Sequence, residues 1–290
     1  MLYTWDNPRV KESNRFIWFE EWVVGRQTLK RISKESRYSE RSLNRYFHQY
    51  LLQPPLLSVR PSEKVNLLID GTYFGNDLCL VVYRDNNIKY TQLYRITNGE
   101  WYEEIKEDLE NLLKLGVQIE SITCDGHKSI LKAVRKSCRH VVVQRCLVHI
   151  QRMCRIWLTM RPKSLAGFDL KQIISKLHTI NTKEDWGYWV VNLISWHRAY
   201  ESFLKEKSYN LQTGRYWYKH KMVRRCFMVI KRALPNMFHY LDNPRIPKST
   251  NGLESFFGHL KGHVQIHRGL SKEHRRNFIK WYLFFRNQNL

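Results

Sequence analysis

The 290-residue sequence predicts an α/β fold in which a mixed β-sheet carries a large all-helical insertion and is preceded by a small helix-turn-helix domain. Short apolar runs alternate with helical patterns up to residue 154, the helical pattern alone continues from about residue 155 to 237, and three prolines follow the first 52 residues. We therefore expect a helix-turn-helix region at 1–52, a linker at 53–62, the first part of the core at 63–154, an insertion at 155–247 and C-terminal helices at 248–290.

The first region contains the pattern of two short amphipathic helices. Leu29 and Ile32 share one face of a helix at 28–36, and a second helix starting at Ser39 turns Leu43 and Phe47 inward. In a DNA-binding helix-turn-helix the second helix enters the major groove, so the exposed side chains able to reach bases or phosphates are Glu40, Arg41, Asn44 and Arg45. Ordinary helical proteins contain the same unit, and this packing interpretation stays open.

The core region has the predicted element order β-β-β-α-β-α-β. Strands are expected at 65–69, 78–83 and 88–96, then a helix at 101–115, a strand at 117–123, a helix at 128–136 and a strand at 140–144. The insertion contains amphipathic segments at 186–204 and 216–234 and no convincing strand. Two prolines within 241–248 end it, and helices are expected from 251 and at 271–286.

The charge of the chain indicates a polyanionic partner. Lys and Arg total 49 against 26 acids, a net charge of +23, which would repel itself in a compact fold unless a polyanion such as nucleic acid lies against it. A ribosome-associated protein or a basic surface kept for solubility remains as an alternative. The six cysteines lack C-x-x-C spacing, and no apolar run is long enough for a membrane helix, so we expect a soluble protein of a reducing compartment.

Two aspartates are candidate ligands for a divalent metal ion. Asp70 and Asp125 each follow a predicted strand and precede a glycine, so both carboxylates should emerge at the rim of the sheet. If a helical crossover makes their strands neighbours, the two acids lie side by side, an arrangement suited to Mg²⁺ or Mn²⁺. The alternative is that each Asp-Gly merely ends a strand in a turn.

Glu254 borders an apolar helical stripe in the C-terminal region. Lys261, close to two turns later, should share its face and could touch DNA beside it. A structural role fits equally well, with Asn251 as the N-cap and Glu254 as its capping-box partner.

Cys146 and His149 form a C-x-x-H element whose spacing is compatible with zinc, with Cys138, His140 or Cys154 as further ligands. We favour a packing or hydrogen-bonding role, because zinc sites normally have four ligands in recognisable pairs. The C-terminal histidines are expected at the surface or facing DNA; they are His259, His263, His267 and His274.

Four ordered blocks give a resemblance to a known family. The segments LIDGTYF (68–74), TCDGHKS (123–129), QRCLVH (144–149) and STNGLE (249–254) resemble the successive signatures of Mutator-like insertion-sequence transposases. The resemblance implies an RNase H-like catalytic domain with a DDE triad formed by Asp70, Asp125 and Glu254, a family C-x-x-H element at Cys146 and His149, and a helical insertion before the Glu.

The resemblance implies a DNA transposase that cleaves transposon ends and transfers them into target DNA. Two Mg²⁺ or Mn²⁺ ions would activate the attacking oxygen, from water and then from the 3′-hydroxyl, and stabilise the leaving one; Asp70 would bridge them, and Asp125 and Glu254 would each hold one. Phosphates would be positioned by basic side chains, among them Lys128, Lys132, Arg135, Lys261, Arg275 and Arg276.

We expect DNA as the partner, in the form of terminal inverted repeats and target, with a homodimer or higher homo-oligomer on DNA and a cytoplasmic, nucleoid-associated location in bacteria. A non-catalytic helix-turn-helix regulator derived from a transposase is the alternative, and a nuclease that cuts without joining is a third possibility.

Overall fold

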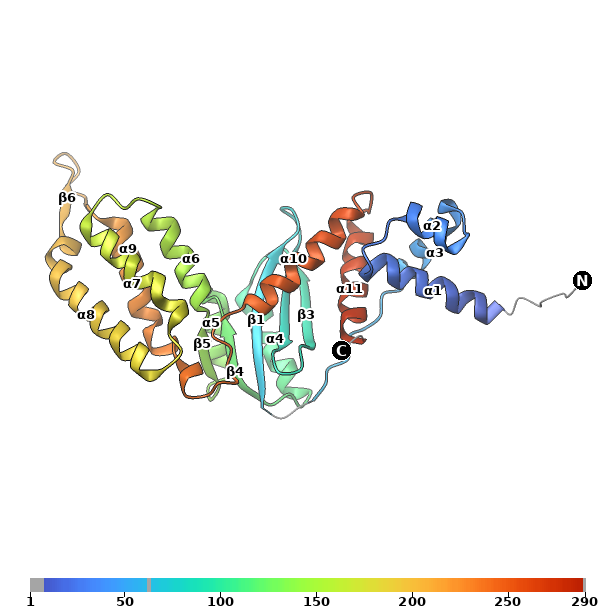
Figure 1. Cartoon of the computed structure of the whole chain (residues 1–290), viewed down its shortest axis with the longest axis horizontal. Coiled ribbons are helices and arrows are strands. Elements are labelled where there is room, and N and C mark those ends of the chain that lie inside the picture. Colours follow the sequence, from blue (N-terminus) through green and yellow to red (C-terminus); the bar gives the residue numbers. More distant parts are fainter. Residues whose placement is uncertain (1–7, 62–63, 289–290) are drawn as a thin grey trace, which may run out of the picture.

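A five-stranded mixed sheet forms the centre of the molecule, between the helical insertion on one side and the N- and C-terminal helices on the other (Figure 1). β1 (Val65–Tyr73), β2 (Cys79–Asp85) and β3 (Thr91–Thr97) are antiparallel, and β4 (Ile119–Cys124) and β5 (Val142–Arg145) continue the sheet in parallel with β1. The resulting order is β3-β2-β1-β4-β5. The computed structural model describes residues 8–61 and 64–288, and the order predicted for the core, β-β-β-α-β-α-β, is confirmed.

The side chains of β1 alternate between two cores. Leu67 and Ile69 pack beneath α4 (Tyr102–Lys114) and α5 (Lys128–Ser137), whereas Leu68 joins the core of α10 (Asn251–Ile266) and α11 (Lys272–Gln288). Since successive residues of a strand point to opposite faces, Asp70 shares the face of Leu68 and is directed to the side that α10 covers. The alternation along β1 therefore places Asp70 on the face of the sheet that α10 covers.

The two predicted N-terminal helices are present as α2 (Leu29–Ser36) and α3 (Glu40–Leu52). The side chains of Thr28 and Ser39 cap them by accepting hydrogen bonds from the backbone N–H groups of Arg31 and Ser42. A further helix, α1 (Pro8–Val24), was not predicted, because its apolar residues 16–19 form a continuous run and not a stripe.

The N-terminal helices share one hydrophobic core with the C-terminal pair. Phe19 of α1 and Phe47 of α3 are buried against α11, where the ring centroids of Phe19 and Trp281 lie 5.1 Å apart. The proline-rich segment that follows α3 is fixed to β3, since the backbone of Arg60 both donates to and accepts from the Gln92 side chain. The α2–α3 pair is thereby held in a defined position relative to the sheet.

The insertion has its own core. Its helices are α6 (Leu147–Leu158), α7 (Leu165–Ser175), α8 (Lys183–Lys205) and α9 (Lys221–Ala233), with single 3₁₀ turns at Lys176–Thr179, Leu234–Asn236 and His239–Leu241.

The expectation that the insertion lacks strands is wrong. A short hairpin, β6 (Lys207–Tyr209) and β7 (Tyr216–Tyr218), joins α8 to α9, and the helix predicted from residue 216 begins only at Lys221. Gly214, with φ of +64°, lets the chain reverse, and the aromatic run 216–218 then extends as a strand. Across residues 8–61 and 64–288, no helix has both the length and the apolar character needed to cross a membrane.

Candidate active site

Asp70 and Asp125 lie at the point where β1 and β4 stop pairing. The last parallel pair is Ile69 with Cys124, and the next residue on each chain is an aspartate. The condition for the two acids to lie side by side, that their strands are neighbours, is therefore met. The prediction that Asp70 ends its strand is wrong, because β1 continues to Tyr73 through its antiparallel pairing with β2. Asp70 is consequently 7% exposed and does not stand at an open rim.

Both glycines that follow the acids make room for a charged side chain. Gly126, with φ of +89°, lies against the Arg145 guanidinium, and a Cβ there would collide with it. Arg145 Nη2 donates to the backbone oxygen of Asp125 at 3.1 Å. A Cβ at Gly71 would collide with the Glu100 carboxylate. The glycine of each Asp-Gly pair therefore has a packing role, because any larger side chain would displace a charged neighbour.

Burial dominates the electrostatics of Asp70. It raises the pKa of this carboxyl to about 7, and the negative charges of Asp125 and Glu100 act in the same direction, while His149 and the N–H of Gly71 act against it. Gly71 donates to Asp70 Oδ1 at 3.0 Å. Asp125 Oδ1 accepts the backbone N–H of His127 at 2.7 Å. Carboxylates that are shielded from solvent and repel one another are stabilised by a bound cation.

Glu100 is an additional acid that the sequence did not reveal. It lies between β3 and α4, its side chain is 12% exposed, and its Oε2 is 3.8 Å from Nδ1 of His127. Burial raises its pKa, and Asp125 raises it further. No periodicity or motif marks Glu100, because it falls in a connection between predicted elements.

Glu254 is brought to the same region by the first turn of α10. Its carboxylate accepts two hydrogen bonds from Arg152, at 3.0 and 2.8 Å, and lies 3.5 Å from Nε2 of His149. The hydrogen bonds from Arg152 lower the pKa of Glu254. The capping-box alternative is wrong, since the N-cap is Thr250 and Asn251 is already the first helical residue. Arg152, on α6, was also not predicted.

The C-x-x-H element forms a hydrogen-bonded link between α6 and α10. His149 Nδ1 lies 3.3 Å from Cys146 Sγ and 3.3 Å from Thr250 Oγ1, and the backbone N–H of Thr250 donates to the same sulfur. Burial alone would raise the pKa of the Cys146 thiol, but the hydrogen bonds from His149 and Thr250 outweigh it and lower this pKa. The hydrogen bond to Cys146 raises the pKa of His149 to about 9. The element thus directs a cationic imidazole at the acids.

Two hydrogen bonds fix the segment that returns from the insertion. Thr123 Oγ1 donates to the carbonyl of Pro247, and the backbone N–H of Leu147 donates to the carbonyl of Lys248. This connection sets Glu254 opposite Asp70 and Asp125, although more than half of the chain separates the first acid from the third.

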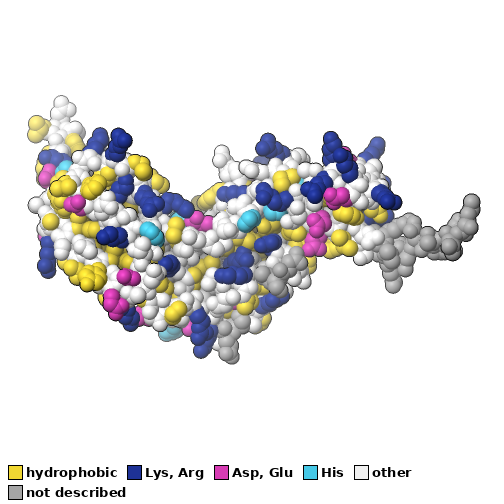
Figure 2. Space-filling model, viewed as in Figure 1, with side chains coloured by type: hydrophobic (Ala, Val, Ile, Leu, Met, Phe, Trp, Pro, Cys, Tyr) yellow, Lys and Arg dark blue, Asp and Glu magenta, His cyan; other side chains and the backbone are white. Residues whose placement is uncertain are grey.

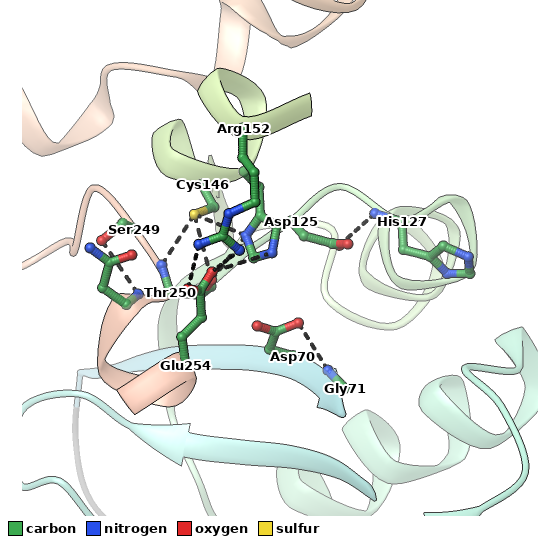
Figure 3. Close-up of polar contacts among 11 residues, drawn as sticks. Asp70, Gly71, Asp125, His127, Cys146, Arg152, Ser249, Thr250 and Glu254 are labelled. Carbon is green, nitrogen blue, oxygen red and sulfur yellow. Dashed lines mark hydrogen bonds and ion pairs between the residues drawn. The ribbon is translucent and has the colours of Figure 1, made fainter. Parts of the chain in front are cut away.

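Figure 3 shows the three acids arriving from three different elements around one space. The donor set consists of carboxylate oxygens, which are the ligands that Mg²⁺ and Mn²⁺ prefer. As the side chains stand, no group of three His, Cys, Asp or Glu among the described residues is arranged to hold one metal ion. Glu254 faces Arg152, and Asp125 is turned to the N–H of His127. The chemistry of the site therefore fits a divalent cation, and its ligation would require these two carboxylates to change partners.

The predicted DNA-contacting side chains are placed at the surface. Arg41, Asn44 and Arg45 are exposed on α3, and Lys261 is exposed on α10. Lys128 and Lys132 are exposed on α5, where Lys132 Nζ lies 3.7 Å from the centroid of the Tyr102 ring.

Three other basic side chains have structural partners. Arg275 pairs with Asp77 at 3.2 Å and is not free for a phosphate as it stands. The expectation that His263 and His267 are surface groups is wrong: Nε2 of His263 is 2.9 Å from the carbonyl of Val24, and Nε2 of His267 is 3.1 Å from that of Trp22. Burial lowers the pKa of His267 to about 4. The unpredicted helix α1 accounts for both differences, because it supplies these carbonyls.

The space-filling view shows the surroundings of the site. Figure 2 shows a hollow between the insertion and the C-terminal helices, with Lys and Arg gathered on both sides of it and acidic and histidine side chains near its floor. Positive flanks around acidic groups suit a polyanionic substrate that is cut or joined by metal-dependent chemistry.

Comparison with known proteins gives one family match. The family model described as "Transposase, Mutator family" matches residues 93–270, which is more than half of the chain and includes Asp125, the C-x-x-H element and Glu254, while Asp70 precedes it. No curated protein matches the chain. The extent of the family match shows that this chain belongs to the Mutator family of transposases.

Proposed function

We propose that the protein is a DDE-type transposase with an RNase H-like core, which cleaves transposon ends and transfers them to target DNA through Asp70, Asp125 and Glu254. Family membership implies a DNA-processing enzyme in general. The observation that carries the finer proposal is the convergence of these three acids on one space, from within β1, from the end of β4 and from the first turn of α10.

Two Mg²⁺ or Mn²⁺ ions, held by the three carboxylates, would activate the attacking oxygen and stabilise the leaving oxygen. For this the protein has to ionise Asp70, whose pKa of about 7 lies in the physiological range. It also has to separate Glu254 from Arg152. The released guanidinium would then be free to bind a DNA phosphate.

DNA would lie along the basic flanks of the hollow. Lys128, Lys132 and Lys261 would hold phosphates, whereas Arg41 and Arg45 on α3 would contact the terminal inverted repeats. We propose that the active complex contains two or more copies of the chain, because two transposon ends have to be cut and joined together.

A strand-transfer assay tests this proposal. Labelled transposon-end duplex, target plasmid and Mn²⁺ are incubated with the wild type, with Asp125→Asn, and with Glu184→Gln, which neutralises an exposed acid of the insertion. We expect joined products from the wild type and the control and none from Asp125→Asn. Cleavage without joining would identify a nuclease instead.

The second candidate is a non-catalytic DNA-binding regulator. The bidentate Arg152–Glu254 pair favours it, because it occupies the acid that a metal would need. Specific duplex binding by the wild type, without any Mn²⁺-dependent cleavage, would support this alternative and contradict the transposase proposal.

A further inference from the structure

The β6–β7 hairpin carries exposed aromatic side chains on both of its faces. The pairs Tyr209–Tyr216 and Lys207–Tyr218 place these four side chains on one face, and Trp217 points to the other with Ser208. Tyr209 is 60% exposed, and Tyr216 and Trp217 are each 53% exposed. Figure 1 shows the hairpin projecting beyond the insertion helices. Single exposed aromatic rings are common, but several gathered on one projecting hairpin form an apolar patch of the kind that marks a binding surface.

The hairpin is built to hold its shape in solvent. The Asn210 side chain accepts the backbone N–H groups of Gln212 and Thr213 at 2.8 and 3.1 Å, which orders the turn. Lys207 Nζ lies 4.0 Å from the centroid of the Tyr216 ring, and the Arg224 guanidinium lies 3.9 Å from that of Tyr218. The aromatic rings are therefore preorganised among cations.

The charge around the hairpin selects the partner. Residues 205–225 contain seven basic side chains and a single acid, Glu206. Lys205 pairs with Glu201 and Lys219 with Glu206, and the other five basic side chains are Lys207, Arg215, Lys221, Arg224 and Arg225. Lysine and arginine side chains alone are sufficient to bind the phosphates of a duplex. Exposed aromatic rings interleaved with them are typical of surfaces on which unpaired bases stack.

We propose that the β6–β7 hairpin binds an unpaired DNA strand, with bases stacked on the Tyr209–Tyr216 face and on Trp217 and with the phosphates held by the surrounding Lys and Arg. The site is separate from the three acids, and its action requires neither metal nor cleavage. In a reaction that opens duplex ends, such a surface would hold the strand released from its complement.

The test measures binding of the full chain, without metal, to a fluorescein-labelled 20-nucleotide oligothymidine and to a 20-base-pair duplex. Tyr216→Ala and Trp217→Ala should each weaken oligothymidine binding about tenfold while changing duplex binding less than twofold. Trp217→Phe should restore most of the affinity. Tyr188→Ala, which removes a 76% exposed aromatic ring of α8, should change neither.

Circular dichroism and the melting temperature establish that each variant is folded. Equal losses for the oligothymidine and the duplex would overturn the proposal, because they would indicate charge alone. Unchanged binding of both DNAs would also overturn it. If binding were unchanged and light scattering gave the variants a lower particle mass than the wild type, the hairpin would be a contact between protein subunits.

The decrease in tryptophan fluorescence on addition of oligothymidine is a second readout. It should be smaller in Trp217→Phe than in the wild type. Equal quenching in the two proteins would show that the bases do not reach Trp217.

Discussion

Replacing Asp70 by Asn should stabilise the metal-free protein at alkaline pH. Burial raises the Asp70 pKa from its ordinary value of 3.8 to about 7, so the folded state binds a proton more tightly than the unfolded state. Stability from this group is present below the unfolded pKa and is lost as the pH rises through about 7. Since a tenfold change in proton affinity corresponds to about 1.4 kcal/mol, keeping Asp70 ionised in the folded state costs up to about 4 kcal/mol.

Urea unfolding in EDTA at pH 8 and at pH 4 measures this effect. Asp70→Asn keeps an oxygen for the Gly71 N–H and should raise the free energy of unfolding by about 2 to 4 kcal/mol at pH 8 and by less than about 0.5 kcal/mol at pH 4. Glu184→Gln should change it little at either pH. A gain of equal size at both pH values would refute the reasoning, because it would not come from ionisation.

Three further variants probe the neighbours of the acids. Glu100→Gln removes a negative charge from the site and should weaken Mn²⁺ binding by about tenfold in calorimetry; unchanged affinity would remove Glu100 from the site. Arg152→Ala frees Glu254 and should strengthen Mn²⁺ binding. The free energy of unfolding should change by less than about 1 kcal/mol, because the Arg152 side chain is 54% exposed. Weaker Mn²⁺ binding would contradict competition between the guanidinium and the metal. Cys146→Ala should lower the pKa of His149 from about 9 toward its ordinary value, followed by NMR titration of the imidazole, since the Cys146 hydrogen bond is the largest cause of the shift; a pKa still near 9 would refute that cause.

The strands of the sheet and their order along the chain were predictable because apolar runs and crossover helices leave a strong local pattern. That order permitted Asp70 and Asp125 to be neighbours, and the pairing of β1 with β4 makes them so. The extension of β1 beyond Asp70 did not, because it depends on antiparallel pairing with β2, and Gly71 there reads as a strand end. Likewise, β6 and β7 are three residues each and lie between two helices, so the turn at Gly214 that joins them is a weak signal beside the surrounding helical pattern.

The approach of Glu254 to the aspartates could be expected only from family resemblance. Its position depends on the path of the chain back from the insertion and on the packing of α10 against Leu68 of β1. The roles of Arg152 and Glu100 could not be predicted for the same reason. Each is a common charged residue whose role arises from contacts with residues distant in the sequence. Long-range partners of this kind leave no periodic signal.

Single-turnover cleavage of a transposon-end duplex in Mn²⁺ tests the central claim most directly, with DNA affinity measured in parallel. The three single variants are Asp70→Asn, Asp125→Asn and Glu254→Gln. We predict that each lowers the cleavage rate at least about a thousandfold while DNA affinity stays within about threefold, because each removes a carboxylate that the proposed metal site requires. Cleavage at the wild-type rate by any one of them would contradict the assignment of these acids to one active site.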